Sequence, residues 1–262
     1  MNGVHRVLDP RVPGQIPRGL CALAVMTKAP RAGQVKTRLT PPLTPAEAAA
    51  LNKCFLRDTT ALIATTAAAG VTRGIAVFTP VDAASSYVGI LPAEFELVPQ
   101  RGEAFGERMI FAMEDLFRLG FESSCLINSD SPTVPQQAFT EATTILAQPN
   151  DTVVLGPSED GGYYLIGLKK LHREIFEDIA WSTEHVLQQT IERARQKNLK
   201  VYLLPKWYDV DNRLALQRLC DEFFGPNGSM GAGYPAPATR GYLDALLKRE
   251  GRDRIWPNES QR

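Results

Sequence analysis

Short apolar stretches alternate with longer amphipathic ones along most of this chain, and this alternation constrains the fold more than any other feature. We expect strands at 21–28, 73–80, 94–99, 123–130, 151–157, 161–168 and 200–205, and helices at 46–69, 106–120, 136–146, 171–179, 182–198, 213–224 and 239–250. Strands that alternate with helices pair mainly in parallel, because each helix carries the chain back across the sheet. The sequence therefore predicts an α/β fold with a mainly parallel central sheet.

The alanine-rich helix at 46–69 has a defined start. Thr44 is the expected N-cap, Pro45 stands at the first helical position, and Glu47 follows the cap by three residues. This is the spacing of a capping box, in which the Thr and Glu side chains each accept a hydrogen bond from a backbone N–H.

The length suits one large α/β domain or two small ones, since the chain has 262 residues. We expect a loose arm at 1–19, because that segment shows no hydrophobic periodicity. The main domain is expected at 20–224, and a Gly/Pro-rich linker with a final amphipathic helix at 225–262.

Charge and composition exclude several classes of protein. The chain has 29 basic and 29 acidic residues, so we expect no nucleic-acid partner, which usually requires a basic excess. We expect no membrane association, since no apolar run approaches the roughly 20 residues of a bilayer span. No signal peptide is visible and the four cysteines are scattered, which suits reduced thiols in the cytoplasm. The histidines lack zinc-ligand spacing.

Cations are concentrated in the loop after the first expected strand. Lys28, Arg31, Lys36 and Arg38 lie within eleven residues and are interleaved with Gly33. A flexible cationic loop at the carboxyl end of a strand suits a phosphate-bearing ligand. The loop lacks the Walker A and G-x-G-x-x-G patterns. The alternative to a phosphate-binding loop is a solvated surface loop.

The stretch "LINSDSPTVP" places Asp130 where a buried strand ends. One interpretation is a cap or Asx-turn at the junction with the next helix. The other is a ligand for Mg²⁺ or Mn²⁺, which take hard oxygen ligands. Magnesium usually binds one or two carboxylates together with substrate phosphates, so the metal hypothesis predicts a second carboxylate elsewhere.

Two carboxylates, Asp209 and Asp211, follow the last expected strand in "WYDVDNRLAL". Residues i and i+2 of an extended segment point to the same side, and two like charges there need a neutralising partner. A metal ion would serve, as would Arg213 or Lys206. Asp211 is also a candidate N-cap for the helix that follows.

The stretch "GPSEDGGYYLIGL" contains an acidic turn, Glu159-Asp160-Gly161-Gly162, before an apolar strand. The two glycines permit positive φ and the close approach of a ligand. A hairpin-type turn built on the common Asp-Gly pair is the alternative. Cations follow one predicted strand and carboxylates lie at the ends of others. A single metal–phosphate site explains this combination better than a separate structural role for each motif.

Several motifs occur in an order that carries a family resemblance: "MTKAPRAGQVKTRLTPPLTPAEAAALNKCFLRDT", "FGERM", "NSDSPTVP", "GPSEDGGYYLIGL", "AWST" and "DVDNRLAL". The chain resembles the DUF2064 family of predicted glycosyltransferases, within the GT-A nucleotide-diphospho-sugar transferase superfamily, over about 21–224. The resemblance implies a Rossmann-like α/β/α sandwich whose nucleotide binds over the first strand and its loop, so that 20–224 forms a nucleotide-binding transferase domain.

The resemblance also implies roles for individual residues. Asp130 and Asp211 would hold a divalent metal, Mg²⁺ or Mn²⁺, and Lys36 and Arg38 would face the phosphates. The remaining implied residues line the nucleotide (Met26, Thr27, Lys28, Gly33) or the donor-sugar or acceptor side (Glu159, Asp160, Gly161). The family pattern near Asp130 reads Gly-Ser-Asp-Cys-Pro, whereas this chain has Asn128 and Ser131 at the Gly and Cys positions.

Three functions follow as hypotheses. The first is a metal-dependent glycosyltransferase that moves a sugar from a nucleotide-sugar to a small-molecule acceptor. Lys36 would assist at the diphosphate and Asp160 would orient or deprotonate the acceptor hydroxyl. The second is a nucleotidyltransferase that joins a nucleoside triphosphate to a phosphorylated acceptor and releases pyrophosphate. The third is a non-catalytic nucleotide-binding module, with Asn128 and Ser131 as signs of lost activity.

Overall fold

The computed structural model of the protein describes residues 4–68, 70–225, 231 and 233–256. Its strands are β1 (Cys21–Lys28), β2 (Thr72–Thr79), β3 (Glu96–Pro99), β4 (Ser123–Ile127), β5 (Thr152–Pro157), β6 (Tyr163–Leu168) and β7 (Lys200–Leu203). Its α-helices are α1 (Pro45–Ala67), α2 (Phe105–Leu119), α3 (Gln136–Ala147), α4 (Val186–Gln196), α5 (Arg213–Phe224) and α6 (Pro237–Glu250). Short 3₁₀ turns occupy Thr37–Leu39, Ala84–Tyr87, Arg173–Phe176 and Arg252–Arg254.

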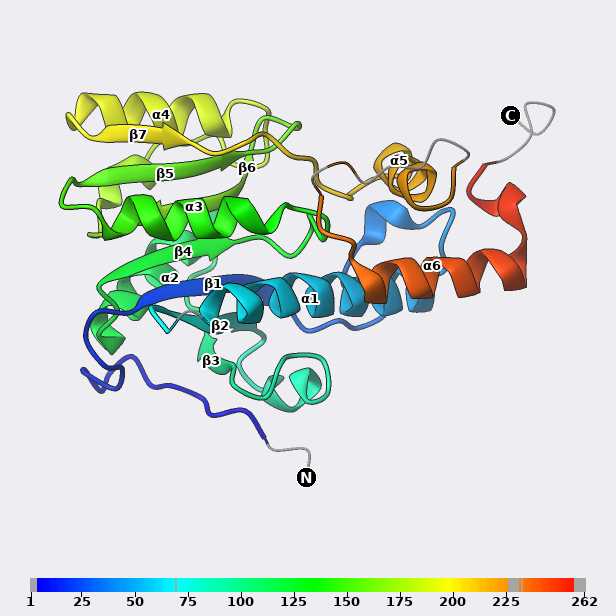
Figure 1. The fold of residues 1–262 in the computed structure, drawn as a ribbon, viewed down its shortest axis with the longest axis horizontal. Coiled ribbons are helices and arrows are strands. Elements are labelled where there is room, and N and C mark those ends of the chain that lie inside the picture. Colours follow the sequence, from blue (N-terminus) through cyan, green and yellow to red (C-terminus); the bar gives the residue numbers. More distant parts are fainter. Residues whose placement is uncertain (1–3, 69, 226–230, 232, 257–262) are drawn as a thin grey trace.

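The strands form one seven-stranded sheet in the order β3-β2-β1-β4-β6-β5-β7. β6 pairs antiparallel with β4 and β5, while the other pairs are parallel. One apolar cluster packs α1 and α3 on one face, and a second packs α2 and α4 on the other (Figure 1). The predicted α/β/α sandwich is therefore confirmed. The strand order reverses between β1 and β4, and ligands of open α/β sheets bind at such a reversal.

The N-terminal segment from residue 4 to residue 19 lies against the sheet, so the loose arm expected there is wrong. Leu8 and Ile16 are buried, and the Leu8 N–H donates to the Leu97 carbonyl at 2.8 Å. The physical reason is that β3 is an edge strand whose backbone groups remain available for pairing.

The C-terminal helix α6 is part of the same body. It lies beside α1 (Figure 1), and its apolar side chains share a third buried cluster with the loop after β1 and with α5. On α1, Asp58 accepts hydrogen bonds from the backbone N–H groups of Ala238 and Thr239 at the start of α6, at 3.0 and 2.7 Å. Part of the expected Gly/Pro linker lies outside the described residues. Among the described helices, none is long and apolar enough to cross a bilayer.

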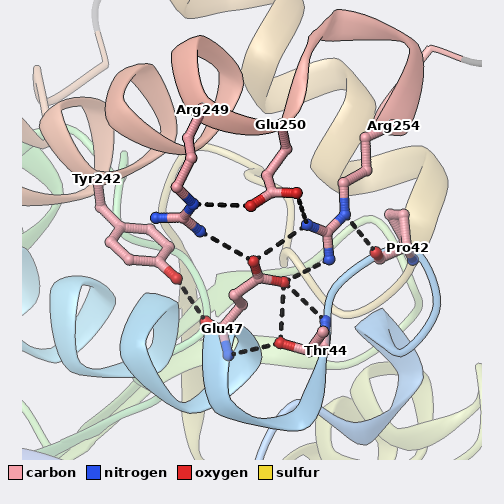
Figure 2. Close-up of polar contacts among 7 residues, drawn as sticks. All are labelled: Pro42, Thr44, Glu47, Tyr242, Arg249, Glu250 and Arg254. Carbon is pink, nitrogen blue, oxygen red and sulfur yellow. Dashed lines mark hydrogen bonds and ion pairs between the residues drawn. The ribbon is translucent and has the colours of Figure 1, made fainter.

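The predicted capping box of α1 is confirmed, and it is also a contact point for the C-terminal segment (Figure 2). Glu47 accepts from the Thr44 N–H at 2.9 Å and from both terminal nitrogens of Arg254 at 3.1 and 2.5 Å. Arg254 also donates to the Pro42 carbonyl at 3.1 Å, and Arg249 reaches Glu47 at 3.1 Å. The C-terminal segment therefore holds both the first turn of α1 and the loop before it.

Arg254→Ala is expected to lower the free energy of unfolding by about 1–2 kcal/mol, because it removes charged hydrogen bonds to Glu47 and the loop bond to Pro42. Arg249→Ala is the matched control and should cost about 0.5 kcal/mol or less, since its side chain is 59% exposed. Urea denaturation of wild type and the two variants measures both losses of stability. Equal losses in the two variants would contradict this role for Arg254.

The same contact predicts a pH dependence. Burial raises the pKa of Glu47, but hydrogen bonds from Thr44 and the charge of Arg254 outweigh it, so the pKa lies below its ordinary value of 4.5. A depressed carboxyl pKa contributes stability above the unfolded value, and that stability is lost as the pH falls through the folded value. The difference in free energy of unfolding between wild type and Arg254→Ala, measured by urea denaturation at several pH values, should therefore narrow below pH 4.5.

Candidate functional site

Two adjoining cavities open at the carboxyl ends of the strands, at the reversal of strand order. The first has a volume of about 350 Å³ and lies over β1 and the cationic loop. The second has a volume of about 710 Å³ and lies between β4, α2 and the loop before α4. The two cavities share several lining residues, namely Met26, Arg38, Phe105, Ser129, Asp130 and Asp211.

Lys36 joins the cationic loop to the acidic strand ends. Its ammonium lies 2.6 Å from an Asp130 oxygen and 2.8 Å from an Asp211 oxygen, and it donates to the Val210 carbonyl at 3.0 Å. It also lies 5.1 Å from the centre of the Phe55 ring, and its side chain is only 4% exposed. The structure thus brings together three predicted site residues that are distant in sequence.

The charge on Lys36 is maintained despite its burial. Desolvation, the largest single contribution, favours the neutral amine, but the charges of Asp130 and Asp211 outweigh it and raise the pKa of Lys36. Lys36 is therefore not the solvated surface cation of the alternative interpretation.

Neither metal-candidate carboxylate serves as a helix cap. Pro135 precedes α3 without a side-chain cap, and Asn212 caps α5 by accepting from the Ala215 N–H at 3.0 Å. Asp130 and Asp211 instead line both cavities, with side chains 34% and 40% exposed. The capping alternative for these two residues is therefore wrong.

The donor set at this point fits a divalent metal. Asp130 and Asp211 both reach one ammonium, so their hard carboxylate oxygens lie within reach of a common cation. Among the residues that the structure describes, no group of three or more His, Cys, Asp or Glu side chains is arranged to hold a metal ion. Two carboxylates suffice for Mg²⁺ when phosphate oxygens and waters complete its coordination.

Asp209 has different partners from Asp211, although the two are separated by one residue. It accepts hydrogen bonds from the Asn128 amide at 2.9 Å and from the hydroxyls of Ser131 and Ser158. Burial raises the pKa of Asp209, and these hydrogen bonds oppose that rise. The neutralising partners expected for the pair were Arg213 or Lys206. Lys36 serves Asp211 instead, and neutral donors serve Asp209.

The Asp209 network explains the two departures from the family pattern. Asn128 and Ser131, which flank Asp130 in the loop after β4, are two of the three donors to this one carboxylate. They connect the loop that carries Asp130 to the segment that carries Asp211. The two residues therefore have a structural role next to Asp130 and Asp211.

Asp209→Ala is expected to destabilise the protein by about 2–4 kcal/mol, because three partly buried donors lose their acceptor. Asp209→Asn is the matched control and should cost much less, since the Asn oxygen still accepts and a serine hydroxyl can rotate to accept from the amide. Thermal unfolding of both variants distinguishes them. Similar losses in both would show that the charge of Asp209, rather than its hydrogen bonds, maintains the network.

The other predicted nucleotide residues divide into two groups. Met26, Thr27, Lys28 and Arg38 line the first cavity, in agreement with their expected position. Gly33 does not line either cavity and adopts a φ of +73° in the loop. Gly33 therefore allows the loop backbone to turn, since a positive φ favours glycine.

The acidic turn after β5 contributes one residue to the second cavity. Asp160 lines it, and one oxygen of Asp160 accepts from the Gly162 N–H at 2.9 Å. Glu159 points elsewhere and pairs with Arg218 at 2.8 Å. Gly161 lies outside the lining and has a φ of +89°, and a Cβ there would lie 2.1 Å from the Glu184 carbonyl. Gly161 is thus required by the close approach of the backbone around Glu184.

The sequence reasoning missed an aromatic wall of the second cavity. The rings of Phe105 and Trp181 meet edge to face at 5.2 Å, and Trp181 packs directly over Gly106. The signal was present, because Phe105 and Gly106 open "FGERM" and Trp181 lies in "AWST". Arg108 of the first motif also lines the first cavity. The two motifs had no assigned role, and the fold places both at the cavities.

Comparison with a family model confirms the resemblance. The model described as "Uncharacterized protein conserved in bacteria (DUF2064)" matches residues 62–183. That span includes Asp130, Asp160 and Trp181, and it lies between the segments that carry Lys36 and Asp211. A search of curated proteins found no match.

Comparison with solved structures finds proteins of similar fold. A protein from Desulfovibrio desulfuricans G20, provisionally described as a nucleotide-diphospho-sugar transferase, is 29% identical with a TM-score of 0.73. The match covers 87% of this chain and 97% of that one. A CMP-2-keto-3-deoxy-manno-octonic acid synthetase bound to CTP is also similar (9% identity, 76% and 96% coverage, TM-score 0.49). A 4-diphosphocytidyl-2C-methyl-D-erythritol synthase from Anaerococcus prevotii DSM 20548 is similar as well, with 11% identity and a TM-score of 0.49, and the match covers 76% of this chain and 95% of that one.

Proposed function

We propose that this protein is a metal-dependent glycosyltransferase that transfers a sugar from a nucleotide-sugar to an acceptor without a phosphate group. The observation that carries the proposal is the difference in charge between the two adjoining cavities. One cavity has the cations that a diphosphate needs, and the other is acidic and aromatic. The similarity to the Desulfovibrio protein supports a nucleotide-sugar as the donor.

The first cavity is suited to the diphosphate of the donor. Lys28, Arg38 and Arg108 line it, and each can donate charged hydrogen bonds to phosphate oxygens. Lys36 also lines it, with its three N–H groups directed at Asp130, Asp211 and the Val210 carbonyl, and contributes positive charge beside them. Asp130 and Asp211 at the boundary would hold Mg²⁺ or Mn²⁺, which when bound would offset the charge that develops on the leaving nucleoside diphosphate.

The second cavity is poorly suited to a phosphorylated acceptor. Lys36 and a bound metal would neutralise Asp130 and Asp211, which line both cavities. The rest of the described lining of the second cavity includes the carboxylates of Asp160, Glu184 and Asp209, and a single cation, Arg38, which also lines the first cavity. A phosphate group there would face like charges, which disfavours its binding. This charge pattern favours glycosyl transfer over nucleotidyl transfer to a phosphorylated acceptor.

Asp160 is the proposed group that orients or deprotonates the acceptor hydroxyl. Its carboxylate lines the second cavity, and among the described residues only one of its oxygens accepts a hydrogen bond, from the Gly162 N–H. A carboxylate near the acceptor can accept the hydroxyl proton while the new glycosidic bond forms.

The test is incubation of the purified protein with each nucleotide-sugar or nucleoside triphosphate, Mn²⁺ and a panel of unphosphorylated and phosphorylated acceptors. Release of a nucleoside diphosphate that depends on an unphosphorylated acceptor is the expected result. Release of pyrophosphate with a phosphorylated acceptor would favour the nucleotidyltransferase instead. Nucleotide binding with no product across the panel would favour a non-catalytic module.

A further inference from the structure

Asn52 is a buried polar residue of α1 that the site described above leaves without a role. It is 6% exposed, and its side chain lines the first cavity beside the cationic loop. Among the described residues, its side-chain amide has no hydrogen-bond partner, in contrast to Thr60 and Asp58 on the same helix. Thr60 donates to the Leu56 carbonyl, and Asp58 caps α6.

The amide atoms are not fully enclosed, so only solvent in the cavity can satisfy them in the absence of a ligand. An asparagine at this cavity wall therefore needs an explanation. The position does not explain it, because asparagine is an unfavourable residue in the interior of a helix. Thr59, about two turns further along the same face of α1, is also buried without a partner, but its hydroxyl is fully enclosed by protein. Asn52 differs because its side chain faces an open cavity of about 350 Å³.

The chemistry of the amide limits what it can bind. Lys28, Lys36 and Arg38 in the same cavity already provide the cations for phosphates. An amide offers donors and an acceptor side by side, and a phosphate, which only accepts, would leave the amide oxygen without a donor. Its best complement is a group that both donates and accepts, such as a ribose hydroxyl or the hydrogen-bonding edge of a base.

We propose that Asn52 binds the nucleoside portion of the nucleotide through such a paired donor and acceptor group, and so contributes to specificity. The assignment rests on the proposed function, because it requires that a nucleotide occupies the first cavity. It adds a nucleoside contact on α1 to the contacts expected from β1 and its loop.

Asn52→Leu is the test variant, because leucine preserves the side-chain volume and removes all hydrogen bonding. We expect nucleotide affinity to fall by about tenfold, from the loss of one or two neutral hydrogen bonds. We also expect little change in the unfolding temperature, since the Asn52 side chain makes no hydrogen bond within the described protein that the substitution would remove. Thr59→Val is the matched control on the same helix, and it should leave the affinity unchanged.

The probes are nucleoside diphosphates with all four bases and their 2′-deoxy and 3′-deoxy analogues, titrated calorimetrically with Mn²⁺. If the partner is a ribose hydroxyl, a deoxy analogue binds wild type weakly and binds Asn52→Leu no worse than the parent nucleotide. If it is the base edge, the preference of wild type among bases disappears in Asn52→Leu. Either result supports the assignment.

Three results would refute, one by one, the role of Asn52, the nucleoside contact and the proposed function. Wild-type affinity in Asn52→Leu would refute the role of Asn52 and leave the proposed function intact. A fall in affinity that is equal for every analogue and every base would place Asn52 on the phosphates and refute the nucleoside contact. If wild type binds none of these nucleotides, the proposed function itself fails.

Discussion

Asp130→Asn and Asp211→Asn are each expected to lower turnover by about a hundredfold or more, because each removes a carboxylate that the divalent metal needs. The metal-dependent part of nucleotide affinity should fall with turnover. Because both residues act through one ion, the double variant should cost much less than the sum of the two single effects. Titration of a nucleoside diphosphate with and without Mn²⁺ measures the metal-dependent part.

Stability provides the internal control for these two variants. Both carboxylates are more than a third exposed and neither caps a helix, so each variant should unfold within about 1 kcal/mol of wild type. Asp244→Asn on α6 removes a carboxylate remote from the cavities and should retain full activity. Undiminished Mn²⁺ dependence in Asp130→Asn would eliminate Asp130 as a metal ligand.

Lys36→Met is expected to lower both nucleotide affinity and stability. Affinity should fall roughly tenfold to a hundredfold, because Asp130 and Asp211 lose the charged hydrogen bonds from Lys36 that hold them in place, and each such bond contributes about 1.5–3 kcal/mol. Stability should fall by about 1–3 kcal/mol, since Asp130 and Asp211 lose the ammonium between them, and solvent screens these half-exposed carboxylates only in part.

Arg38→Ala is the matched comparison, because Arg38 is an exposed cation of the same loop. It should weaken nucleotide binding with little change in unfolding temperature. Adding Asp130→Asn to Lys36→Met should recover part of the lost stability, because the second change removes an uncompensated charge. Isothermal calorimetry and thermal unfolding of the four proteins test this. A Lys36→Met variant as stable as Arg38→Ala would refute the structural part of the role of Lys36.

The sequence alone was sufficient to predict which ends of the strands carry the polar residues that line the two cavities. Lys36, Asp130 and Asp211 belong to three separate segments, in which Asp130 ends a predicted strand and the other two follow one. Parallel strands present their carboxyl ends at one edge of a sheet, so the three side chains were expected near one another. The capping box of α1 was likewise local information, because Thr44 and Glu47 bond within one helical turn.

The sequence could not indicate which polar side chains pair with which. The αL backbone of Lys36, with a φ of 50°, and the docking of the loop after β1 on α5 and α6 bring its ammonium between two carboxylates. Asp209 and Asp211 look equivalent in sequence, but the donors around them come from different strand ends. In the same way, only the packing of α1 shows that Asn52 faces a cavity.

The sequence by itself therefore determined the α/β class, most of the elements and the polar strand ends, because hydrophobic periodicity and capping are properties of neighbouring residues. The tertiary structure decided the pairing of Lys36 with two carboxylates, the network around Asp209, and the packing of both chain ends onto the domain. Those contacts join atoms from segments distant in sequence. Their free energies depend on burial and geometry, which exist only once the sheet and its helices have packed.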